Sequence, residues 1–578
     1  MKKVHVTATL AFASAVVALG FIGCHADEND PAGQAKELAD PVRRDNAISN
    51  IHRMYTSSLS QNNGNRAAPA VKSIADATVE LLTSTWLEHE EDVQARRRIL
   101  DTLYEMRDPR SLPALVKALK WRPEVSEQVA IRAAQTLAVL DIPAGKKPEV
   151  VTALSDALEQ VSGARGVDNQ MRIEFIRALG AMHERSAGQV LTKIMLRQTE
   201  DQNFLINRLA GEQLVPVAEA SQVDAFVQAL YLFASVQPDM RMNDIASEGL
   251  VRIGRPAVPA LLAVLAGENQ QVTTLVQAFI EAQNARLRQR DPSAQVPSVS
   301  VASLAASDAL YTLGELGFRE SIDKMIEMSR SEDTMTRLAA SVALPRINRT
   351  DADTARVREA LLRVYEASDK MSRMQLLRAM QHLNDPGVLP FLLATARAPE
   401  EALPDIRVIA LNAYAMLANK QEAVAARAII AEEPEDGFKR TFIDQNEAAL
   451  AAADECDVNV QCWLGKLAAR PAPGVRQTAA QTAAAAIVSR KAAYMIARLA
   501  PRGDATALRA LIAQIDHPED TVRNDVFYAI DWLSPSGNAA AIAKINDLRS
   551  VEEGRAIWNR VKTIAMMTQA RLQNRQGS

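Results

Sequence analysis

The chain has 578 residues, of which 48% are hydrophobic and only 4% aromatic, and its formal net charge is -4. This length could hold several globular domains, yet no change in composition marks a boundary between residues 68 and 574. A mildly acidic balance offers no cationic surface for a phosphate backbone, so we expect no nucleic acid among the partners.

The first 23 residues have the layout of a secretory signal. Positive charges at Lys2 and Lys3 precede an apolar stretch over residues 10–22. This stretch is shorter than the roughly 20 residues that a helix needs to cross the apolar core of a bilayer. We therefore expect residues 1–23 to be removed as a signal peptide, which would change the net charge from -4 to -6.

The run Phe21-Ile22-Gly23-Cys24 resembles the lipobox of bacterial lipoproteins, in which a cysteine after a small residue is acylated and becomes the new N-terminus. The resemblance implies a lipid anchor on Cys24 with several acyl chains, such as palmitate, and several chains anchor a protein more stably than one. The alternative is an ordinary signal peptide cleaved elsewhere, with an incidental thiol at this position. In lipoproteins of this kind, an Asp directly after the acylated cysteine disfavours sorting to the outer membrane. This chain has His25 at that position. We thus expect a lipid-anchored location in the bacterial cell envelope, at the outer membrane and facing either the periplasm or the outside.

Five segments are expected along the chain. Residues 24–42 are acidic, contain Pro and Gly and carry few apolar side chains, which predicts a flexible tether. The other segments are the signal peptide, N-terminal capping helices over 43–90, a repeat solenoid over 91–550, and a C-terminal capping helix and tail over 551–578.

One sequence unit recurs along the solenoid segment: an amphipathic helix, a turn with Asp, Gly or Pro, and a second helix that often opens with Pro. Clear copies occupy residues 93–120, 243–267, 371–396, 491–515 and 520–545. In the first copy, Ile99, Leu103 and Met106 fall at three- and four-residue spacings, so this helix has one face that only a neighbouring helix can cover. Pro113 lies in the first turn of the second helix, where a missing N–H costs nothing.

These units resemble HEAT repeats, including the shorter form named for phycobilisome (PBS) lyases. The residues that carry the resemblance are the turns Asp108-Pro109, Gly254-Arg255-Pro256 and Asp385-Pro386, and the helix starts Leu112-Pro113, Val258-Pro259 and Leu389-Pro390. The resemblance implies an all-α fold, an α-solenoid of about eleven HEAT-like helical hairpins wound into a right-handed superhelix. It also implies a protein–protein interaction scaffold whose partner is a protein or peptide.

Two cysteines remain once Cys24 is acylated, and they are close in the sequence. In an oxidising exported compartment we expect Cys456 and Cys462 to form a disulfide that clips the turn between two helices. Closing so short a loop contributes about 2 kcal/mol. A metal site would need further ligands, and no His lies nearby.

The repeat rhythm is interrupted over residues 284–300, where a basic helix end runs into a Ser- and Pro-rich segment. Arg286, Arg288 and Arg290 make this segment a candidate binding loop. The alternative is a solvated insertion between repeats.

Two further motifs have simple structural interpretations. Arg96-Arg97-Arg98 lies in a helix, where consecutive residues point to different faces, and acidic neighbours offset its charge, so we expect a solvated face. Arg502-Gly503-Asp504 spells an integrin-binding tripeptide but falls where a turn between helices is expected, and a turn favours Gly for backbone reasons.

The sequence contains no HExxH, GxSxG, GxGxxG or Walker motif, and its seven His are scattered. We therefore expect a protein that is not an enzyme, without a metal, cofactor or small-molecule substrate. The favoured function is an envelope scaffold. The alternatives are a structural envelope spacer or assembly subunit, and a lyase or chaperone-like factor, because the short HEAT form resembles subunits that attach bilins.

Overall fold

The computed structural model describes residues 26–121, 128–199, 202–235, 237–293, 295, 299–347, 349–398, 404–432, 437–469 and 478–576. In these segments the chain is a succession of paired helices, and strand-like pairing is limited to one bridge between Phe233 and Arg241. None of the helices described is long and apolar enough to cross a membrane. The prediction of an all-α solenoid of helical hairpins is confirmed. The chain divides into two compact units after residue 213.

Unit 1 stacks its helices in two layers. Its helices are α2 (Pro31–Glu37), α3 (Arg44–Gln61), α4 (Pro69–Glu88), α5 (Val93–Met106), α6 (Leu112–Ala118), α7 (Gln128–Val139), α8 (Lys147–Glu159), α9 (Gly166–Met182) and α10 (Gly188–Leu196). Helices α3, α5, α7 and α9 contact one another in turn, and α4, α6 and α8 form the second layer. The next helix, α11 (Phe204–Leu214), spans the division between the units.

The hairpin of α5 and α6 shows how the sequence sets the repeat. Asp92 caps the N-terminus of α5, because its side chain accepts a hydrogen bond from a backbone N–H in the first turn. Arg107 ends the helix in the left-handed conformation, at φ 51°. The side chain of Asp108 then starts the turn, and Pro113 lies in the first turn of α6, where its missing N–H is harmless.

The structure differs from the predicted tether at residues 24–42. Helix α2 lies in this segment, begins after the capping residue Asp30, and packs against α3 and α4. Ala35 and Leu38 are buried, and the guanidinium of Arg44 donates to the carbonyl of Leu38 over 2.9 Å. Two apolar side chains and one cap suffice to dock so short a helix. The low apolar content of this segment therefore does not indicate a flexible tether.

The structure also corrects the expected solvated face in α5. Arg96 is only 1% exposed, and its guanidinium packs against the indole rings of Trp86 and Trp121, 4.3 Å and 5.0 Å from their centres. The two indoles meet edge to face, with their centres 6.1 Å apart. Burial lowers the pKa of Arg96. Its neighbours Arg97 and Arg98 are exposed as expected, since successive helical residues point in different directions.

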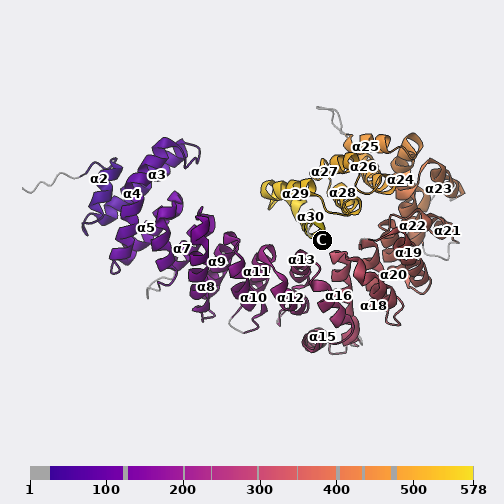
Figure 1. Cartoon of the computed structure of the whole chain (residues 1–578), viewed down its shortest axis with the longest axis horizontal. Helices are drawn as coiled ribbons and strands as arrows, with labels where there is room; N and C mark the ends of the chain where they lie inside the picture. The colour runs from indigo at the N-terminus through magenta and orange to yellow at the C-terminus, as the bar shows by residue number, and fades with distance from the viewer. Residues whose placement is uncertain are drawn as a thin grey trace, which may run out of the picture. The chain divides into compact units, whose positions relative to one another are not determined.

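Unit 2 contains the remaining helices. They are α12 (Val223–Ala229), α13 (Asn243–Ile253), α14 (Ala257–Leu265), α15 (Gln270–Arg290), α16 (Val301–Leu316), α17 (Ile322–Met328), α18 (Thr334–Ala343), α19 (Asp351–Glu366), α20 (Lys370–Gln381), α21 (Leu389–Arg397), α22 (Pro404–Leu417), α23 (Lys420–Glu432), α24 (Gly437–Cys456), α25 (Val460–Ala468), α26 (Ala479–Leu499), α27 (Ala505–Ile512), α28 (Asp520–Leu533), α29 (Ala539–Glu552) and α30 (Ala556–Gln576). The inner helices of this unit form a closed circuit (Figure 1). Each contacts the next in the order α13, α16, α18, α20, α22, α26, α28 and α30, and α30 contacts α13.

The circuit closes where α30 returns to α13. The side-chain amide of Asn574 donates to the carbonyl of Val251 over 2.6 Å, and Arg571 pairs with Glu315 of α16 at 2.8 Å. Gly254 makes this approach possible, because a Cβ at this residue would lie 2.8 Å from the side chain of Asn574. The two ends of unit 2 are therefore held together.

Helix α30 is not the capping helix that the sequence predicts for residues 551–578. A cap has one polar outer face, whereas α30 contacts α28 and α29 as well as α13 and α16. Trp558 and Leu572 are fully buried, and Arg571 is also buried. The last helix is thus an interior element of unit 2.

Candidate functional site

A cavity of about 500 Å³ lies inside unit 2, between α16, the turn after α18, α20, α26, α28 and α30. Its charged lining is mostly cationic. Six arginines line the cavity: Arg346, Arg490, Arg502, Arg560, Arg571 and Arg575. Three carboxylates line it: Glu315, Asp525 and Asp531. The volume falls in the range of small-molecule and peptide pockets.

Two carboxylates and three guanidiniums form a network on one wall of the cavity. Asp531 pairs with Arg571 and Arg575, each at 3.2 Å, and Glu315 pairs with Arg571 and Arg346. Burial would raise the pKa of Asp531, but the two neighbouring guanidiniums outweigh it and hold that pKa below its usual range. Positive charge therefore exceeds negative charge within this network.

A tryptophan flanked by two arginines forms another wall. The guanidiniums of Arg349 and Arg502 lie 4.8 Å and 4.5 Å from the ring centre of Trp532, within the range of cation–π attraction. Burial lowers the pKa of Arg349 to about 10. Arg502 belongs to the tripeptide at the expected turn, where Gly503 has φ +86° and Asp504 caps α27. The tripeptide is thus a structural turn that also places an arginine at the cavity.

A buried aromatic cluster lies beside the third carboxylate. Asp525 pairs with Arg490 at 2.6 Å and accepts a hydrogen bond from the hydroxyl of Tyr494 at 3.0 Å. The ring of His382 lies 5.9 Å from that of Tyr494 and 5.0 Å from that of Tyr528. Desolvation lowers the pKa of His382 to about 4, and the positive charges of Arg346 and Arg490 act in the same direction. The imidazole is therefore neutral at pH 7.

The remaining lining residues combine one exposed cation with apolar and amide groups. Arg560 is 60% exposed and pairs with Asp520 at 2.7 Å. Ile564 and Met567 follow on the same helix and add apolar surface. The side-chain carbonyl oxygen of Asn524 is buried and has no hydrogen-bond partner among the residues that the structure describes. An anion with an apolar body would find complementary groups on these walls.

This cavity could not be read from local sequence patterns. Its arginines come from segments separated by up to 229 residues, from Arg346 to Arg575, and they meet only because α30 closes unit 2. A weak signal exists in α30. Arg560, Arg571 and Arg575 give this helix a high positive charge, although it also carries buried apolar residues. In the described part of the chain, no group of three His, Cys, Asp or Glu could hold a metal ion.

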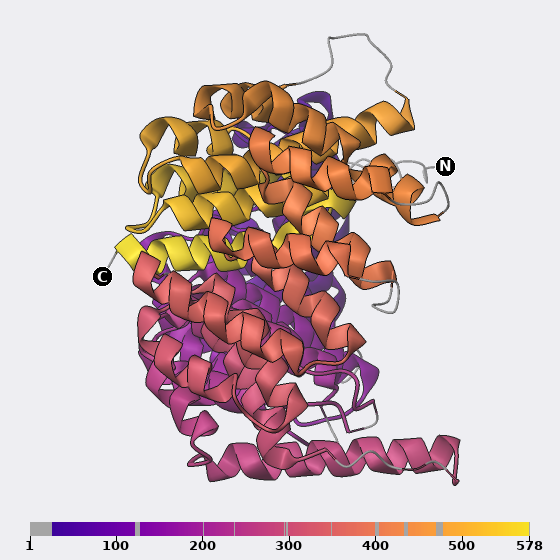
Figure 2. The ribbon, with the colours of Figure 1, turned by 90° about the vertical axis from the view of Figure 1, so that its right-hand side faces the viewer.

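The candidate binding loop lies elsewhere. Arg286, Arg288 and Arg290 are on the last turns of α15, which Figure 2 shows in pink along the lower edge of the view, extending past its neighbours. Arg286 forms an ion pair with Asp239, and the other two are exposed. None of the three lines the cavity. Positions 294 and 296–298 of this segment lie outside the described residues, and a binding role for the arginines stays a prediction.

The predicted lipid anchor at Cys24 lies outside the described residues, as does the whole of the predicted signal peptide.

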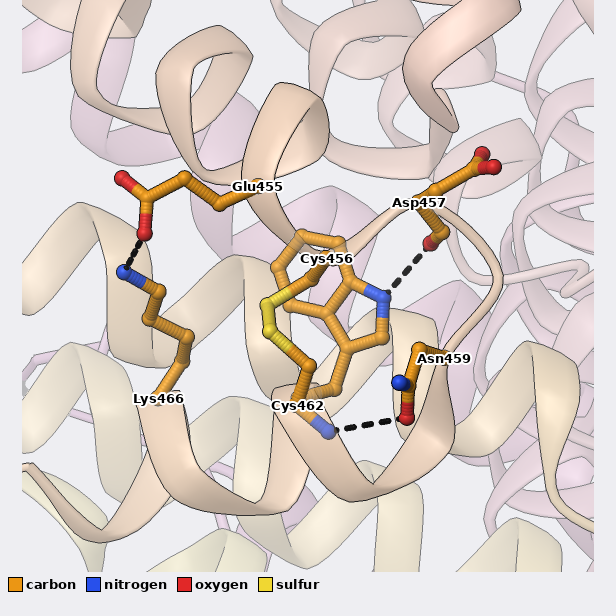
Figure 3. The surroundings of a disulfide bond; sticks show 7 residues. Glu455, Cys456, Asp457, Asn459, Cys462 and Lys466 are labelled. Atoms are coloured by element: carbon orange, nitrogen blue, oxygen red, sulfur yellow. Dashed lines mark hydrogen bonds and ion pairs between the residues drawn. A yellow bond between two sulfur atoms is a disulfide. The ribbon is translucent and has the colours of Figure 1, made fainter.

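The other two cysteines are joined at the turn between α24 and α25 (Figure 3). The disulfide connects Cys456, the last residue of α24, to Cys462, with a Cα–Cα distance of 5.2 Å. Asn459 caps α25 by accepting from the backbone N–H of Cys462 at 3.1 Å. The indole of buried Trp463 donates to the carbonyl of Asp457 at 2.8 Å. The bond therefore clips a turn that a cap and an indole already hold.

Comparisons with known proteins agree with the repeat architecture. The family described as PBS lyase HEAT-like repeat matches residues 95–120, which form most of the α5–α6 hairpin. No curated protein sequence is similar to the chain. The family match and the paired helices together support a HEAT-repeat protein.

Several solved structures of helical solenoids are similar to this chain. The structure of Kap121p bound to Nup53p is 12% identical, with 94% of this chain and 56% of that chain covered and a TM-score of 0.43. The structure of Kap121p alone is 12% identical, with 96% of this chain and 68% of that chain covered and a TM-score of 0.43. The structure of importin beta in an ammonium sulfate condition is 14% identical, with 98% of this chain and 75% of that chain covered and a TM-score of 0.39. The chain spans little more than half the length of the first of these proteins.

Proposed function

We propose that this chain is a lipoprotein of the bacterial cell envelope, anchored through Cys24, whose HEAT-like solenoid is a protein–protein interaction scaffold. The observation that carries the scaffold role is the closed circuit of unit 2, which gathers arginine, tyrosine and tryptophan side chains around one cavity. These side-chain types dominate the binding energy of protein interfaces. A stacked helical array also holds its inner helices rigidly, which lowers the entropy cost of binding.

The anchor rests on the lipobox-like run at residues 21–24 and is tested separately. We expect the mature protein in a bacterial host to begin with an acylated Cys24, as measured by mass spectrometry of its N-terminal peptide. The variant Cys24→Ala should be released from membranes. An unmodified N-terminus on a soluble wild-type chain would reject the anchor and leave the scaffold role standing.

The scaffold role is tested by photo-crosslinking in intact cells. A photoreactive residue at position 563, which lines the cavity on α30, is compared with one at position 363, an exposed site on the outer helix α19. We expect a discrete protein adduct from position 563 and none from position 363. Equal adducts from both positions, or no adduct from position 563, would favour a structural spacer without a dedicated partner.

A further inference from the structure

The cavity of unit 2 has the chemistry of a ligand site, independent of any membrane anchor. We infer that it binds a carboxylate group attached to an apolar body, supplied either as a free organic acid or as an acidic residue beside an apolar one in a partner segment. The second source would rest on the proposed scaffold role, whereas the first would not. The inference stands on the charge, the exposed guanidiniums and the apolar walls of the cavity.

The charge of the lining favours an anion. Six arginines and three carboxylates line the cavity, and Asp520 pairs with Arg560 from outside the lining, which leaves an excess of two positive charges. His382 adds none because it is neutral at pH 7. Low-dielectric walls strengthen the attraction of such an excess for an anion over its value in water. A cationic ligand of the same shape would be repelled.

Two arginines present N–H groups that remain accessible. The side chains of Arg346 and Arg560 are 52% and 60% exposed, although each also pairs with a carboxylate. A guanidinium has five N–H donors in a planar fork, so one partner does not use all of them. The fork matches the two oxygens of a carboxylate, which makes this group the preferred anion.

The rest of the lining accommodates an apolar body. Ile347, Ile564 and Met567 lie with the rings of Trp532 and Tyr528 around a volume of about 500 Å³. This space fits a small aromatic acid or two side chains of a peptide. A ligand that fills it would bury apolar surface while its acid group meets the arginines.

The unsatisfied amide of Asn524 adds a second polar point. Its buried side-chain oxygen has no partner among the described residues, and a buried acceptor of this kind is stabilised when a ligand supplies a donor. Backbone N–H groups and hydroxyl groups are such donors. The lining thus selects an acid, an apolar body and a neighbouring donor.

The test is calorimetric titration of the full chain, purified in detergent, with two probes of the same shape and opposite charge. 4-Phenylbutyrate should bind, and 4-phenylbutylamine should bind at least about tenfold more weakly. A short amidated peptide with a central Phe-Asp pair identifies the source. Tighter binding of this peptide than of the free acid assigns the site to a partner segment, and the reverse assigns it to a small molecule. Equal binding of acid and amine, or binding of neither the acid nor the peptide, would overturn the inference.

Variants locate the site. In the double variant Arg346→Gln/Arg560→Gln we expect the acid to bind about tenfold or more weakly, because two charged donors are lost. Arg363→Gln, which removes an exposed arginine of α19, should leave the affinity unchanged. Thr563→Trp keeps every arginine but fills the cavity, so it should also abolish binding. Thermal unfolding of each variant identifies any that fails to fold. Unchanged affinity in both folded cavity variants would place the acid elsewhere.

Discussion

At the scale of single residues, one buried arginine of unit 1 packs against two tryptophans. Arg96 lies in a run of three arginines, and it is the one that is buried against Trp86 and Trp121. The sequence predicts neither this burial nor the contact, because Trp121 follows in a later turn and the helix face is decided by the neighbouring helix. Local charge patterns therefore identify exposed arginines poorly where tryptophans lie nearby.

The stability of this arrangement can be measured directly. We expect Arg96→Ala to lower the free energy of unfolding by about 3 kcal/mol, because it removes two cation–π contacts and leaves a void beside the indoles. Arg97→Ala, one residue along the same helix and exposed, should change it by less than about 0.5 kcal/mol. Chemical denaturation followed by tryptophan fluorescence makes the comparison. Equal losses in the two variants would show that the stacking contributes nothing.

His382 predicts a defined pH dependence. Its folded-state pKa of about 4 lies below the ordinary value of 6.5, so the unfolded chain binds the extra proton first. The contribution of neutral His382 is complete above pH 6.5 and is lost as the pH falls toward 4. Between pH 7 and pH 4.5 the wild type should lose about 2 kcal/mol more than His382→Phe. Parallel losses in both proteins would contradict an imidazole that stays neutral in the folded chain.

At the scale of helices, the sequence predicts much of the architecture and misses the two ends. Hairpins such as α5–α6 follow from caps, prolines and apolar spacing, which are local signals. The sequence does not predict helix α2, because only two buried apolar side chains dock it. The interior place of α30 was missed because its partners α13 and α16 lie more than 200 residues earlier.

The disulfide between α24 and α25 joins two neighbouring helices, as the sequence predicts. Because it closes a loop with a sequence separation of only 6, we expect reduction to lower the free energy of unfolding by about 2 kcal/mol. Hydrogen exchange should report the loss mainly in α25, where Asn459 and Trp463 already hold the turn. The variant Cys456→Ala/Cys462→Ala provides the control, since a reductant should not change its stability. A uniform loss of protection across unit 2 would argue against a local clip.

At the scale of the whole molecule, the cavity exists because unit 2 closes on itself. Its arginines come from α26, α30 and the turns after α18 and α26, and no local motif connects them. Sequence periodicity predicts that helices stack, but it does not predict whether the first and last helices of an array meet. The sequence therefore predicts the fold class but does not predict this cavity.

One backbone position at the contact between α13 and α30 allows the effect of closure to be separated from that of backbone strain. Gly254 and Gly267 both have positive φ, +83° and +73°, but only Gly254 has a side chain, that of Asn574, where a Cβ would lie. Replacing either by Ala should cost about 1 to 3 kcal/mol of backbone strain. Only Gly254→Ala should also displace α30 from α13, increase hydrogen exchange over residues 570–576, and weaken the acid site built on Arg571 and its neighbours. If Gly267→Ala had the same effect on α30, the loss would come from general strain, and the contact between Asn574 and α13 would not hold the circuit closed.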